Sequence, residues 1–574
     1  MERLLTPFGE KLDKKLPLND YPRPQLQRDS FQNLNGIWSY AIYPIGEGFS
    51  GYQGDIVVPF SPETILSGVE RTVTPSDKLY YKREFDFKKD NDRAILHFGA
   101  VDYECSVKIN GKEVGSHKGG YYPFSFDITD VVIVGKNEIT VEVVDPSDKG
   151  EQARGKQSSK RGGIWYTPQS GIWQTVWIEQ LCDNYITYLK MTPDIDKDTL
   201  SVELNFFKNQ EKAVIEVFDG ETAIASTITK DGKAEIKLKD YQCWSPENPK
   251  LYDMVIKTES DMVYSYFGMR KFGIGKDVNN IPRLMLNNKP YFHNGLLDQG
   301  YWSDGMYTPP SDEAMIYDIK LMKDMGFNML RKHIKIEPLR WYYHCDRLGM
   351  LVWQDMINGG GIYTMGIIGI LPFIGIMLKD NKYKAFRRTD VKAREEYYID
   401  SERMIKALYN TVSLAMWVPF NEGWGQFDAE KAYNFYKKLD PTRTIDHASG
   451  WHDQKCGDFR SLHVYFRKIK MPKDKRPIIL SEFGGYSLQA KGHMYNKEKF
   501  FGYKKFYNQA EFEKALARLF KEEVIAQISK GLSATVYTEV SDVEDECNGL
   551  VSYDRKVVKI NMEFIRSINE QVRL

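Results

Sequence analysis

The sequence lacks a net charge of either sign. Its 79 lysines and arginines are matched by 79 aspartates and glutamates, so the formal net charge is zero. Proteins that bind nucleic acid or an anionic membrane usually carry a basic excess, and we therefore expect neither partner. Cysteine is scarce as well: the chain has 6, none in a CxxC pair and none at a spacing typical of zinc sites. We expect free thiols and no structural metal.

Long hydrophobic segments are nearly absent. The range Met1–Lys15 contains no apolar stretch of the length that a secretory signal needs, which predicts a cytoplasmic protein. One uncharged run, Met356–Leu378, is about as long as a bilayer crossing, but 6 glycines and Pro372 interrupt it. We expect this run to form a hydrophobic lid or a contact between copies of a homo-oligomer, and not a membrane span.

The first half of the chain has the pattern of two β-sandwiches. Residues 1–182 consist of short alternating or aromatic runs separated by turns, and Asn110-Gly111 between two of these runs indicates a hairpin. Residues 183–275 repeat the pattern over a length typical of an immunoglobulin-like sandwich. We therefore predict two successive sandwich domains with these boundaries.

From residue 276 to residue 574 the pattern changes to strand-like runs that alternate with helical periodicity, which is typical of a parallel sheet built from βαβ units. The eight strand candidates are Tyr291–Leu296, Asn328–His333, Leu351–Asp355, Ser413–Asn421, Thr444–Ser449, Ser461–Phe466, Ile478–Phe483 and Ala534–Val540. Eight such units predict a (β/α)8 TIM barrel. In that fold the chemistry lies on the loops that follow the carboxyl ends of the strands.

Two of these strands end in glutamates. The fourth candidate strand leads into Asn421-Glu422, and the seventh leads into Ser481-Glu482. Strands four and seven lie across the barrel mouth from each other, so their carboxylates can flank one ligand. Hydrolysis of a glycoside needs this arrangement, because one carboxylic acid protonates the leaving oxygen while the other carboxylate attacks or stabilises the anomeric carbon.

These residues carry a resemblance to a known family. The runs FNMLRKH (327–333), NTVSLAMWVPFNE (410–422) and SEFGG (481–485) resemble the signatures of family 2 glycoside hydrolases, and RGGIWYTPQSGIWQTVWIE (161–179) resembles the end of that family's sugar-binding sandwich. The resemblance covers essentially the whole chain. It implies a galactose-binding-like jelly roll, an immunoglobulin-like sandwich and a catalytic barrel, in that order.

The resemblance also implies roles for single residues. Glu422 would be the general acid/base, Glu482 the nucleophile of a reaction that retains anomeric configuration, Asn421 a partner of the sugar 2-hydroxyl, and Tyr465 a hydrogen-bond donor to the nucleophile. A nucleophile must stay ionised while an acid must hold its proton, so we predict that Glu422 has the higher pKa. Other polar or flat side chains at the strand ends are substrate-binding candidates: Arg331, His333, His463, Asp298, Asp355, Trp302, Trp424 and Trp451.

The substrate is predicted less sharply. β-Glucuronidases of this family resemble the chain but carry an Asn-x-Lys signature whose lysine pairs with the sugar carboxylate, and here Glu546 and Asn548 stand at those positions. We therefore expect an exo-acting β-glycosidase for neutral sugars, with β-galactoside first and β-mannoside, β-glucoside, β-glucuronide or a pentoside left open. A non-catalytic carbohydrate-binding protein is the alternative from another class. No cofactor is required, although a Mg²⁺ or Na⁺ ion near the sugar stays open.

A basic cluster in the amino-terminal half is a weaker candidate. Lys156, Lys160 and Arg161 lie close together beside glycines. Such clusters are more often solvated loops than phosphate or nucleic-acid sites. We therefore predict an exposed loop here.

Overall fold

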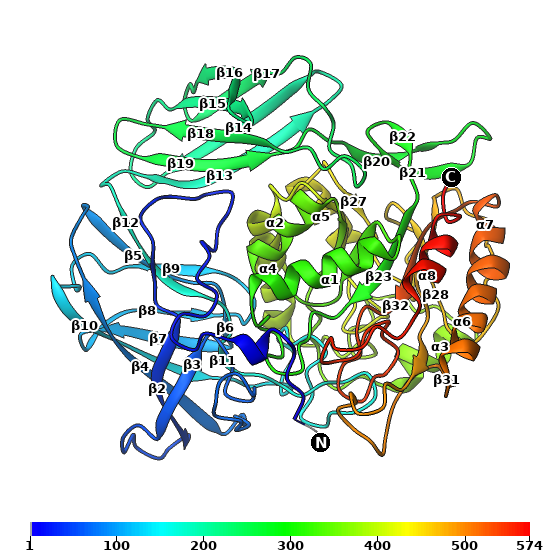
Figure 1. Cartoon of the computed structure of the whole chain (residues 1–574), viewed down its shortest axis with the longest axis horizontal. Coiled ribbons are helices and arrows are strands. Elements are labelled where there is room, and N and C mark those ends of the chain that lie inside the picture. Colours follow the sequence, from blue (N-terminus) through cyan, green and yellow to red (C-terminus); the bar gives the residue numbers. More distant parts are fainter. Residues whose placement is uncertain (1–2) are drawn as a thin grey trace.

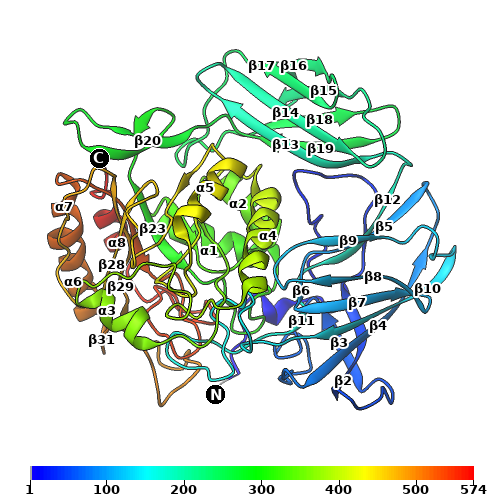
Figure 2. The same cartoon turned by 180° about the vertical axis from the view of Figure 1, so that it is seen from behind.

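The computed structural model describes residues 3–574 and contains two β-sandwiches that lie against a larger domain of strands and helices (Figures 1 and 2). In Figure 1 the first sandwich is blue and lies at the left, while the second is green and lies at the top. Within the described part of the chain, no helix combines the length and apolar character needed to cross a membrane.

The first sandwich has two main antiparallel sheets, with strand orders β1-β12-β5-β9 and β3-β2-β4-β10-β7-β8, and a short β11-β6 pair. On β10, the buried Ile139, Val141 and Val143 alternate with more exposed residues, as expected for a strand with one face in the core. The strands are β1 (Gln32–Asn33), β2 (Gly36–Pro44), β3 (Gly54–Val58), β4 (Asp77–Phe87), β5 (Arg93–Phe98), β6 (Val101–Asp102), β7 (Glu104–Ile109), β8 (Lys112–Lys118), β9 (Phe124–Asp127), β10 (Gly135–Val144), β11 (Gly171–Ile172) and β12 (Val176–Leu181); a single turn, η1 (Gly9–Lys11), precedes them.

The second sandwich pairs a three-stranded sheet, β13-β14-β17, with a four-stranded sheet, β16-β15-β18-β19, around a separate core. A small sheet, β20-β21-β22, then leads into the third domain. The strands are β13 (Ile186–Asp194), β14 (Thr199–Phe206), β15 (Val214–Asp219), β16 (Thr222–Ile228), β17 (Lys233–Lys237), β18 (Tyr252–Lys257), β19 (Met262–Phe267), β20 (Phe272–Lys276), β21 (Pro282–Leu286) and β22 (Lys289–Pro290). The predicted boundary at residue 182 falls between β12 and β13, and the one at residue 275 falls within β20.

The third domain is a sheet of eight strands in the order β27-β26-β25-β24-β23-β32-β29-β28, and all of its ladders are parallel. The two end strands meet through side chains, since Ser461 donates to Asp446 Oδ2 at 2.8 Å. The strands are β23 (His293–Asp298), β24 (Met329–Lys332), β25 (Leu351–Asp355), β26 (Leu414–Val418), β27 (Thr444–Ile445), β28 (Arg460–Val464), β29 (Ile478–Gly484) and β32 (Leu532–Thr538). Each of them overlaps one of the eight predicted strands.

Helices cover the outside of this sheet, but not after every strand. Ser311 caps α1 by accepting a hydrogen bond from the Ala314 amide, as its position in the sequence predicts. The helices are α1 (Asp312–Asp324), α2 (Leu339–Leu348), η2 (Gly366–Ile370), α3 (Leu371–Phe373), α4 (Val391–Leu408), α5 (Ala429–Leu439), α6 (Gln509–Arg518), η3 (Leu519–Ile525), α7 (Ala526–Ile528) and α8 (Met562–Asn569); a β30 (Tyr486–Leu488) and β31 (Lys504–Phe506) pair lies outside the main sheet. Residues 446–459 and 465–477, all of them described, form loops where the prediction of eight βα units has helices.

The apolar run after β25 is folded into short pieces. It contains a single π-helical segment, η2, followed by the three-residue α3, and several of its large side chains face solvent, among them Ile362, Met365, Ile370 and Ile374. It therefore projects from the barrel as a loop with an apolar surface. Its roles as a lid or an oligomer contact stay predictions.

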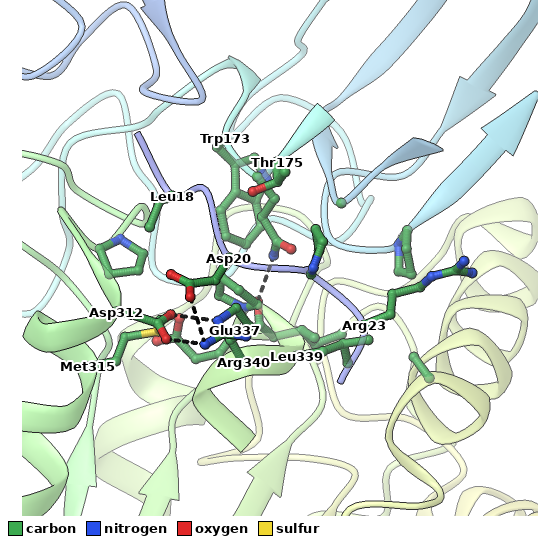
Figure 3. Close-up of a pocket in the computed structure, with 18 of the residues that line it drawn as sticks. Leu18, Asp20, Arg23, Trp173, Thr175, Asp312, Met315, Glu337, Leu339 and Arg340 are labelled. Atoms are coloured by element: carbon green, nitrogen blue, oxygen red, sulfur yellow. Dashed lines mark hydrogen bonds and ion pairs between the residues drawn. The ribbon is translucent and has the colours of Figure 1, made fainter. Parts of the chain in front are cut away.

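The amino-terminal segment joins the first sandwich to the barrel. Arg340 on α2 donates to Asp312 at 2.8 Å and lies 3.4 Å from Asp20 of that segment (Figure 3). The pocket drawn there has a volume of only about 50 Å³ and is lined by Trp173 and Trp177 of the sandwich together with Leu339 and neighbouring barrel residues. None of the predicted site residues lines it, so this pocket belongs to the packing between domains.

Glycine is needed at one position in the seventh barrel strand. Gly484 has a φ of +86°, and a Cβ added there would lie 2.3 Å from the Tyr537 ring. Gly492 has a similar φ of +81° but open space around it. We predict that Gly484→Ala lowers the unfolding temperature more than Gly492→Ala, because only the former adds a clash, worth about 1–3 kcal/mol, to the shared cost of a left-handed alanine. Thermal unfolding followed by circular dichroism checks this, and equal shifts would contradict it.

Candidate active site

The two glutamates predicted to carry the chemistry lie together at the carboxyl ends of the barrel strands. Glu422 follows β26 and has a left-handed backbone, with φ +50°, fixed in part by a hydrogen bond from its amide to the Ser449 carbonyl at 3.0 Å. Glu482 lies within β29. An unfavourable backbone conformation held at a polar, buried residue is common at functional sites.

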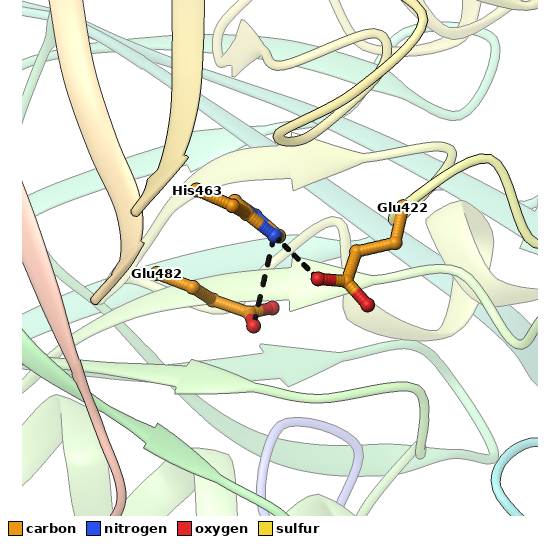
Figure 4. A group of neighbouring side chains, drawn as sticks. All are labelled: Glu422, His463 and Glu482. Carbon is orange, nitrogen blue, oxygen red and sulfur yellow. Dashed lines mark hydrogen bonds and ion pairs between the residues drawn. The ribbon is translucent and has the colours of Figure 1, made fainter. Parts of the chain in front are cut away.

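A histidine lies between the two carboxylates. His463 Nδ1, at the end of β28, lies 2.9 Å from Glu422 Oε1 and 3.7 Å from Glu482 Oε2 (Figure 4). One ligand atom from each of the three side chains lies within 4.8 Å of the other two, and all three residues are buried. Carboxyl groups this close fit a retaining glycosidase, where the separation is about 5–5.5 Å, better than an inverting one, where about 6.5–9.5 Å leaves room for water. The same three atoms are also close enough to share a metal ion.

Glu482 is surrounded by groups that favour its ionised form. Arg331 Nη1 donates to Glu482 Oε1 at 3.2 Å, and the Tyr465 hydroxyl donates to Oε2. Burial by itself would raise the pKa of Glu482, but the nearby charges of His463 and Arg331 outweigh it and hold this pKa below the usual range. The arrangement therefore favours an ionised Glu482 carboxylate.

Glu422 has the opposite tendency. Burial raises its pKa, and the negative charge of Glu482 raises it further, against the hydrogen bond from His463, so that the net direction is upward. The two carboxyl groups are therefore driven apart in pKa in the sense that the sequence predicts. Such a split is how a site assigns one carboxyl group as acid and the other as base or nucleophile.

A buried polar network fixes the side chains around the pair. Arg331 donates from Nε and Nη2 to the two oxygens of Asp355, at 2.9 and 3.0 Å, and from Nη2 to Asn421 Oδ1 at 2.7 Å. His333 Nδ1 lies 2.6 Å from Asp355 Oδ2. Asn421 Nδ2 is buried and has no hydrogen-bond partner among the described residues. A buried donor without a partner is costly, so this nitrogen is suited to bind an oxygen of a ligand.

Two of the predicted tryptophans lie beside this network. The Trp424 ring is 6.2 Å from His333 and 5.1 Å from Trp165 of the first sandwich. The Trp451 ring is 6.0 Å from His463 and 5.6 Å from Phe373 in the apolar loop. Trp424 therefore lies near His333, and Trp451 lies near His463, the histidine that contacts Glu422.

The other two substrate-binding candidates, Asp298 and Trp302, contact charged side chains of the protein. Asp298 accepts from Lys332 Nζ at 2.7 Å and from the Gly300 amide at 2.9 Å. The guanidinium of Arg555 lies 4.3 Å over the Trp302 ring. No hydrogen bond or ion pair joins either residue to Glu422 or Glu482 within the described chain. Their roles in substrate binding stay predictions, and the contacts seen are structural.

The sequence did not predict that residues of the first sandwich lie beside the candidate site. Lys156, in the loop between β10 and β11, is only 5% exposed, and its Nζ lies 5.7 Å from the Trp424 ring and 5.5 Å from the Tyr166 ring. Tyr166 in turn donates to Glu546 at 2.5 Å. The prediction that Lys156 belongs to a solvated loop is therefore wrong, because the loop packs against the barrel. No local pattern in the sequence signals this contact.

Three family descriptions match the chain in succession. "Glycosyl hydrolases family 2, sugar binding domain" matches residues 57–178, "Glycosyl hydrolases family 2" matches residues 184–270, and "Glycosyl hydrolases family 2, TIM barrel domain" matches residues 278–573. The last match alone covers more than half of the chain. The chain belongs to glycosyl hydrolase family 2. The order of its domains and the barrel prediction are thereby confirmed.

Known members of the family differ in the activity for which they are named. A β-galactosidase of Leuconostoc mesenteroides subsp. mesenteroides is 26% identical over 469 residues, covering 75% of this chain and 43% of that protein. A β-glucuronidase of Streptococcus agalactiae is 24% identical over 528 residues, covering 82% and 84%. The solved β-glucuronidase of Ruminococcus gnavus has a TM-score of 0.75 at 17% identity and covers 96% and 99%. The chain spans about half the length of the curated β-galactosidases it matches.

The order of the two pKa values is testable without any substrate. We predict that ¹³C NMR of labelled glutamate side chains finds Glu482 titrating below the usual range and Glu422 above it. Glu482→Gln should then lower the pKa of Glu422, because it removes the negative charge that raises it. An unchanged or higher pKa of Glu422 in the variant would mean that burial alone sets its value.

Proposed function

We propose that this protein is a retaining, exo-acting β-glycosidase that hydrolyses glycosides of neutral sugars, with β-galactosides as the preferred substrates. The closeness of the Glu422 and Glu482 carboxylates, within 4.8 Å, carries this proposal, because it suits two-step displacement through a covalent intermediate. The opposite directions of their pKa values support the same division of roles. A binding protein without activity would need neither feature.

The reaction takes two steps. Glu482 attacks the anomeric carbon and forms a glycosyl ester, while Glu422 gives its proton to the leaving oxygen. The ester carries no charge, so the pKa of Glu422 falls and the ionised Glu422 can take a proton from water. That water attacks the anomeric carbon from the opposite side to the ester, which restores the starting configuration. Asn421, with its free Nδ2, binds the sugar 2-hydroxyl during both steps.

The proposal of a neutral sugar as the glycone depends on two residues in the loop after β32. Glu546 and Asn548 stand where the uronide signature has asparagine and lysine, and Asn548 Nδ2 donates to Glu546 Oε1 at 3.0 Å. Both residues are buried, so a sugar carboxylate placed beside them would meet the acidic Glu546 side chain, with asparagine at position 548 in place of the lysine of the uronide signature. The curated relatives named β-galactosidase agree with a neutral hexose.

One observation favours a β-glucuronide as the second candidate. Lys156 is buried near Trp424 and forms no ion pair within residues 3–574. The charge of Lys156 acts to lower the pKa values of Glu422, Asp355 and Glu539, but none of these carboxyl groups lies within ion-pair distance, and a sugar carboxylate would supply such a close partner. If the enzyme cleaves a glucuronide, Lys156→Met should abolish that activity selectively, and neutral glycosides should then be the poorer substrates of the unmodified enzyme.

A panel of p-nitrophenyl α- and β-glycosides tests the activity and the glycone together: galactoside, glucoside, mannoside, glucuronide, arabinoside and fucoside. We expect one neutral β-glycoside to be cleaved, the galactoside first. Glu482→Ala should lower kcat by at least about 1,000-fold, because the nucleophile is lost. Glu498→Ala, which removes an exposed glutamate, is the matched control and should leave the rate unchanged. Cleavage that survives Glu482→Ala, or silence across the panel, would contradict the proposal.

Metal dependence can be tested on the same substrate. Glu422, His463 and Glu482 could hold an ion, but a metal there would occupy the oxygens needed for proton transfer and attack. We therefore predict that activity persists, within about two-fold, after dialysis against EDTA, whereas a metal-activated water would be lost with its ion. Loss of activity in EDTA and its recovery with Mg²⁺ or Zn²⁺ would show instead that an ion takes part.

A further inference from the structure

Glu539 is a fully buried glutamate at the mouth of the barrel that has no role in the proposed reaction. It directly follows β32, which lies between β23 and β29 in the sheet, and β29 carries Glu482. The hydroxyl oxygen of the preceding residue, Thr538, lies 3.2 Å from that of Tyr465. Tyr465 in turn donates to Glu482. Glu539 is therefore the neighbour in sequence of a residue that touches a partner of the proposed nucleophile.

The carboxyl group of Glu539 is only half satisfied within the described part of the chain. Gln299, which follows β23, donates from Nε2 to Glu539 Oε2 at 2.9 Å, but the buried Oε1 has no hydrogen-bond partner there. Asn548 in the loop after β32 has a buried Oδ1 that is also unpartnered among residues 3–574, and its carbonyl accepts from the Glu539 amide at 3.2 Å. Buried oxygens without partners are costly, so these two are suited to bind the polar groups of a ligand.

Glu539 stands on the rim of the barrel opposite the proposed acid/base. Counted round the barrel in either direction, β32 is four strands from β26, the strand that Asn421 and Glu422 follow. Lys156 lies near enough to both rims for its positive charge to act against the raised pKa of Glu422 and that of Glu539. A cation that acts on carboxyl groups of both rims indicates that the Glu539 side chain is directed over the barrel mouth.

The surroundings of Glu539 favour a neutral ligand group. Burial raises the pKa of Glu539 well above the usual range, and the negative charge of Glu546 raises it further. A protonated carboxyl group can donate a hydrogen bond as well as accept one. A hydroxyl group also does both, so it complements Glu539 together with the unpartnered oxygen of Asn548.

We propose that Glu539 determines the choice of sugar by binding the 4- or the 6-hydroxyl of the glycone. This inference rests on the proposed function, in which Asn421 binds the 2-hydroxyl. In a pyranose ring, C5, which bears the 6-hydroxymethyl group, lies across the ring from C2, and C4 is next to C5. A sugar whose 2-hydroxyl is held at the rim of Asn421 therefore extends its 4- and 6-hydroxyls toward the opposite rim, where Glu539 stands.

The test removes the hydrogen bond from the enzyme and from the substrate in turn. The measured quantity is kcat/KM on the p-nitrophenyl glycoside that the panel identifies and on its 4-deoxy and 6-deoxy analogues. Glu539→Leu removes both oxygens and keeps a side chain of similar size, while Glu539→Gln keeps a group that can donate and accept. Glu544→Leu is the matched control, since it removes another buried glutamate of the same loop, whose oxygens accept from the Thr167 amide at 3.1 and 3.2 Å.

We expect Glu539→Leu to lower kcat/KM on the parent glycoside by roughly 10- to 100-fold, but by less than about 3-fold on the analogue that lacks the bound hydroxyl. Glu539→Gln should lose less than Glu539→Leu on the parent, and Glu544→Leu should change the parent and both analogues by the same factor. The unmodified enzyme should cleave one deoxy analogue at least about 30-fold less efficiently than the parent, because the oxygens of the site are then left without a partner.

Two results overturn this inference and leave the proposed function standing. The first is a loss in Glu539→Leu that is equal on the parent and on both analogues, or no loss at all. The second needs no variant: it is equal kcat/KM of the unmodified enzyme on all three glycosides. If the unmodified enzyme cleaves no glycoside of the panel, both the inference and the proposed function fall.

Discussion

The buried guanidinium of Arg331 holds the site together. Its donors reach Asp355 after β25, Asn421 after β26, and Glu482 and the Ser481 carbonyl on β29. A guanidinium fully removed from water is costly unless carboxylates and carbonyls surround it, and here two carboxylates and two amide-type oxygens do. The same contacts fix where Glu482 lies and keep it ionised. The ends of β25 and β26 therefore cannot move without disturbing Glu482, the proposed nucleophile.

The residues of this network could be predicted from the sequence because of where they stand relative to the strands. The residues that matter most follow apolar runs with the period of buried parallel strands, and the fold places the ends of such strands at one rim. Glu422, Glu482, Arg331, Asn421 and His463 could therefore be brought together from strand order alone. Their neighbours could not be placed so well, because a loop after a strand has no periodicity. Asp298 and Trp302 also lie at or after the end of a strand, yet both contact other side chains of the protein. Asp298 accepts a hydrogen bond from Lys332, and the Arg555 guanidinium lies over the Trp302 ring.

Contacts between domains were not predictable from the sequence. Lys156 and Tyr166 reach the barrel because the long connection between β10 and β11 folds over it, and Arg154 is anchored there by a hydrogen bond from its amide to the Asn358 carbonyl at 3.0 Å. Nothing in the local sequence separates this connection from an ordinary polar loop. The first sandwich therefore contacts the barrel beside the candidate active site, through Lys156 at Trp424 and Tyr166 at Glu546. The connections after β27 and β28 form loops without helices, and residues of both line a cavity of about 550 Å³.

The residues of the candidate site stand on two kinds of segment that differ in rigidity: strand ends and loops. The groups that move protons and form bonds stand on strands or directly after them, where packing fixes their positions to the precision that catalysis requires. The residues on which the choice of sugar is proposed to depend stand on loops from different segments: Lys156 in the β10–β11 connection, and Glu539, Glu546 and Asn548 in the loop after β32. Loops tolerate substitution far better than strands do. A chain can therefore keep the chemistry of the family at low sequence identity while its substrate changes, which is why the pattern of strands predicts the reaction more sharply than it predicts the sugar.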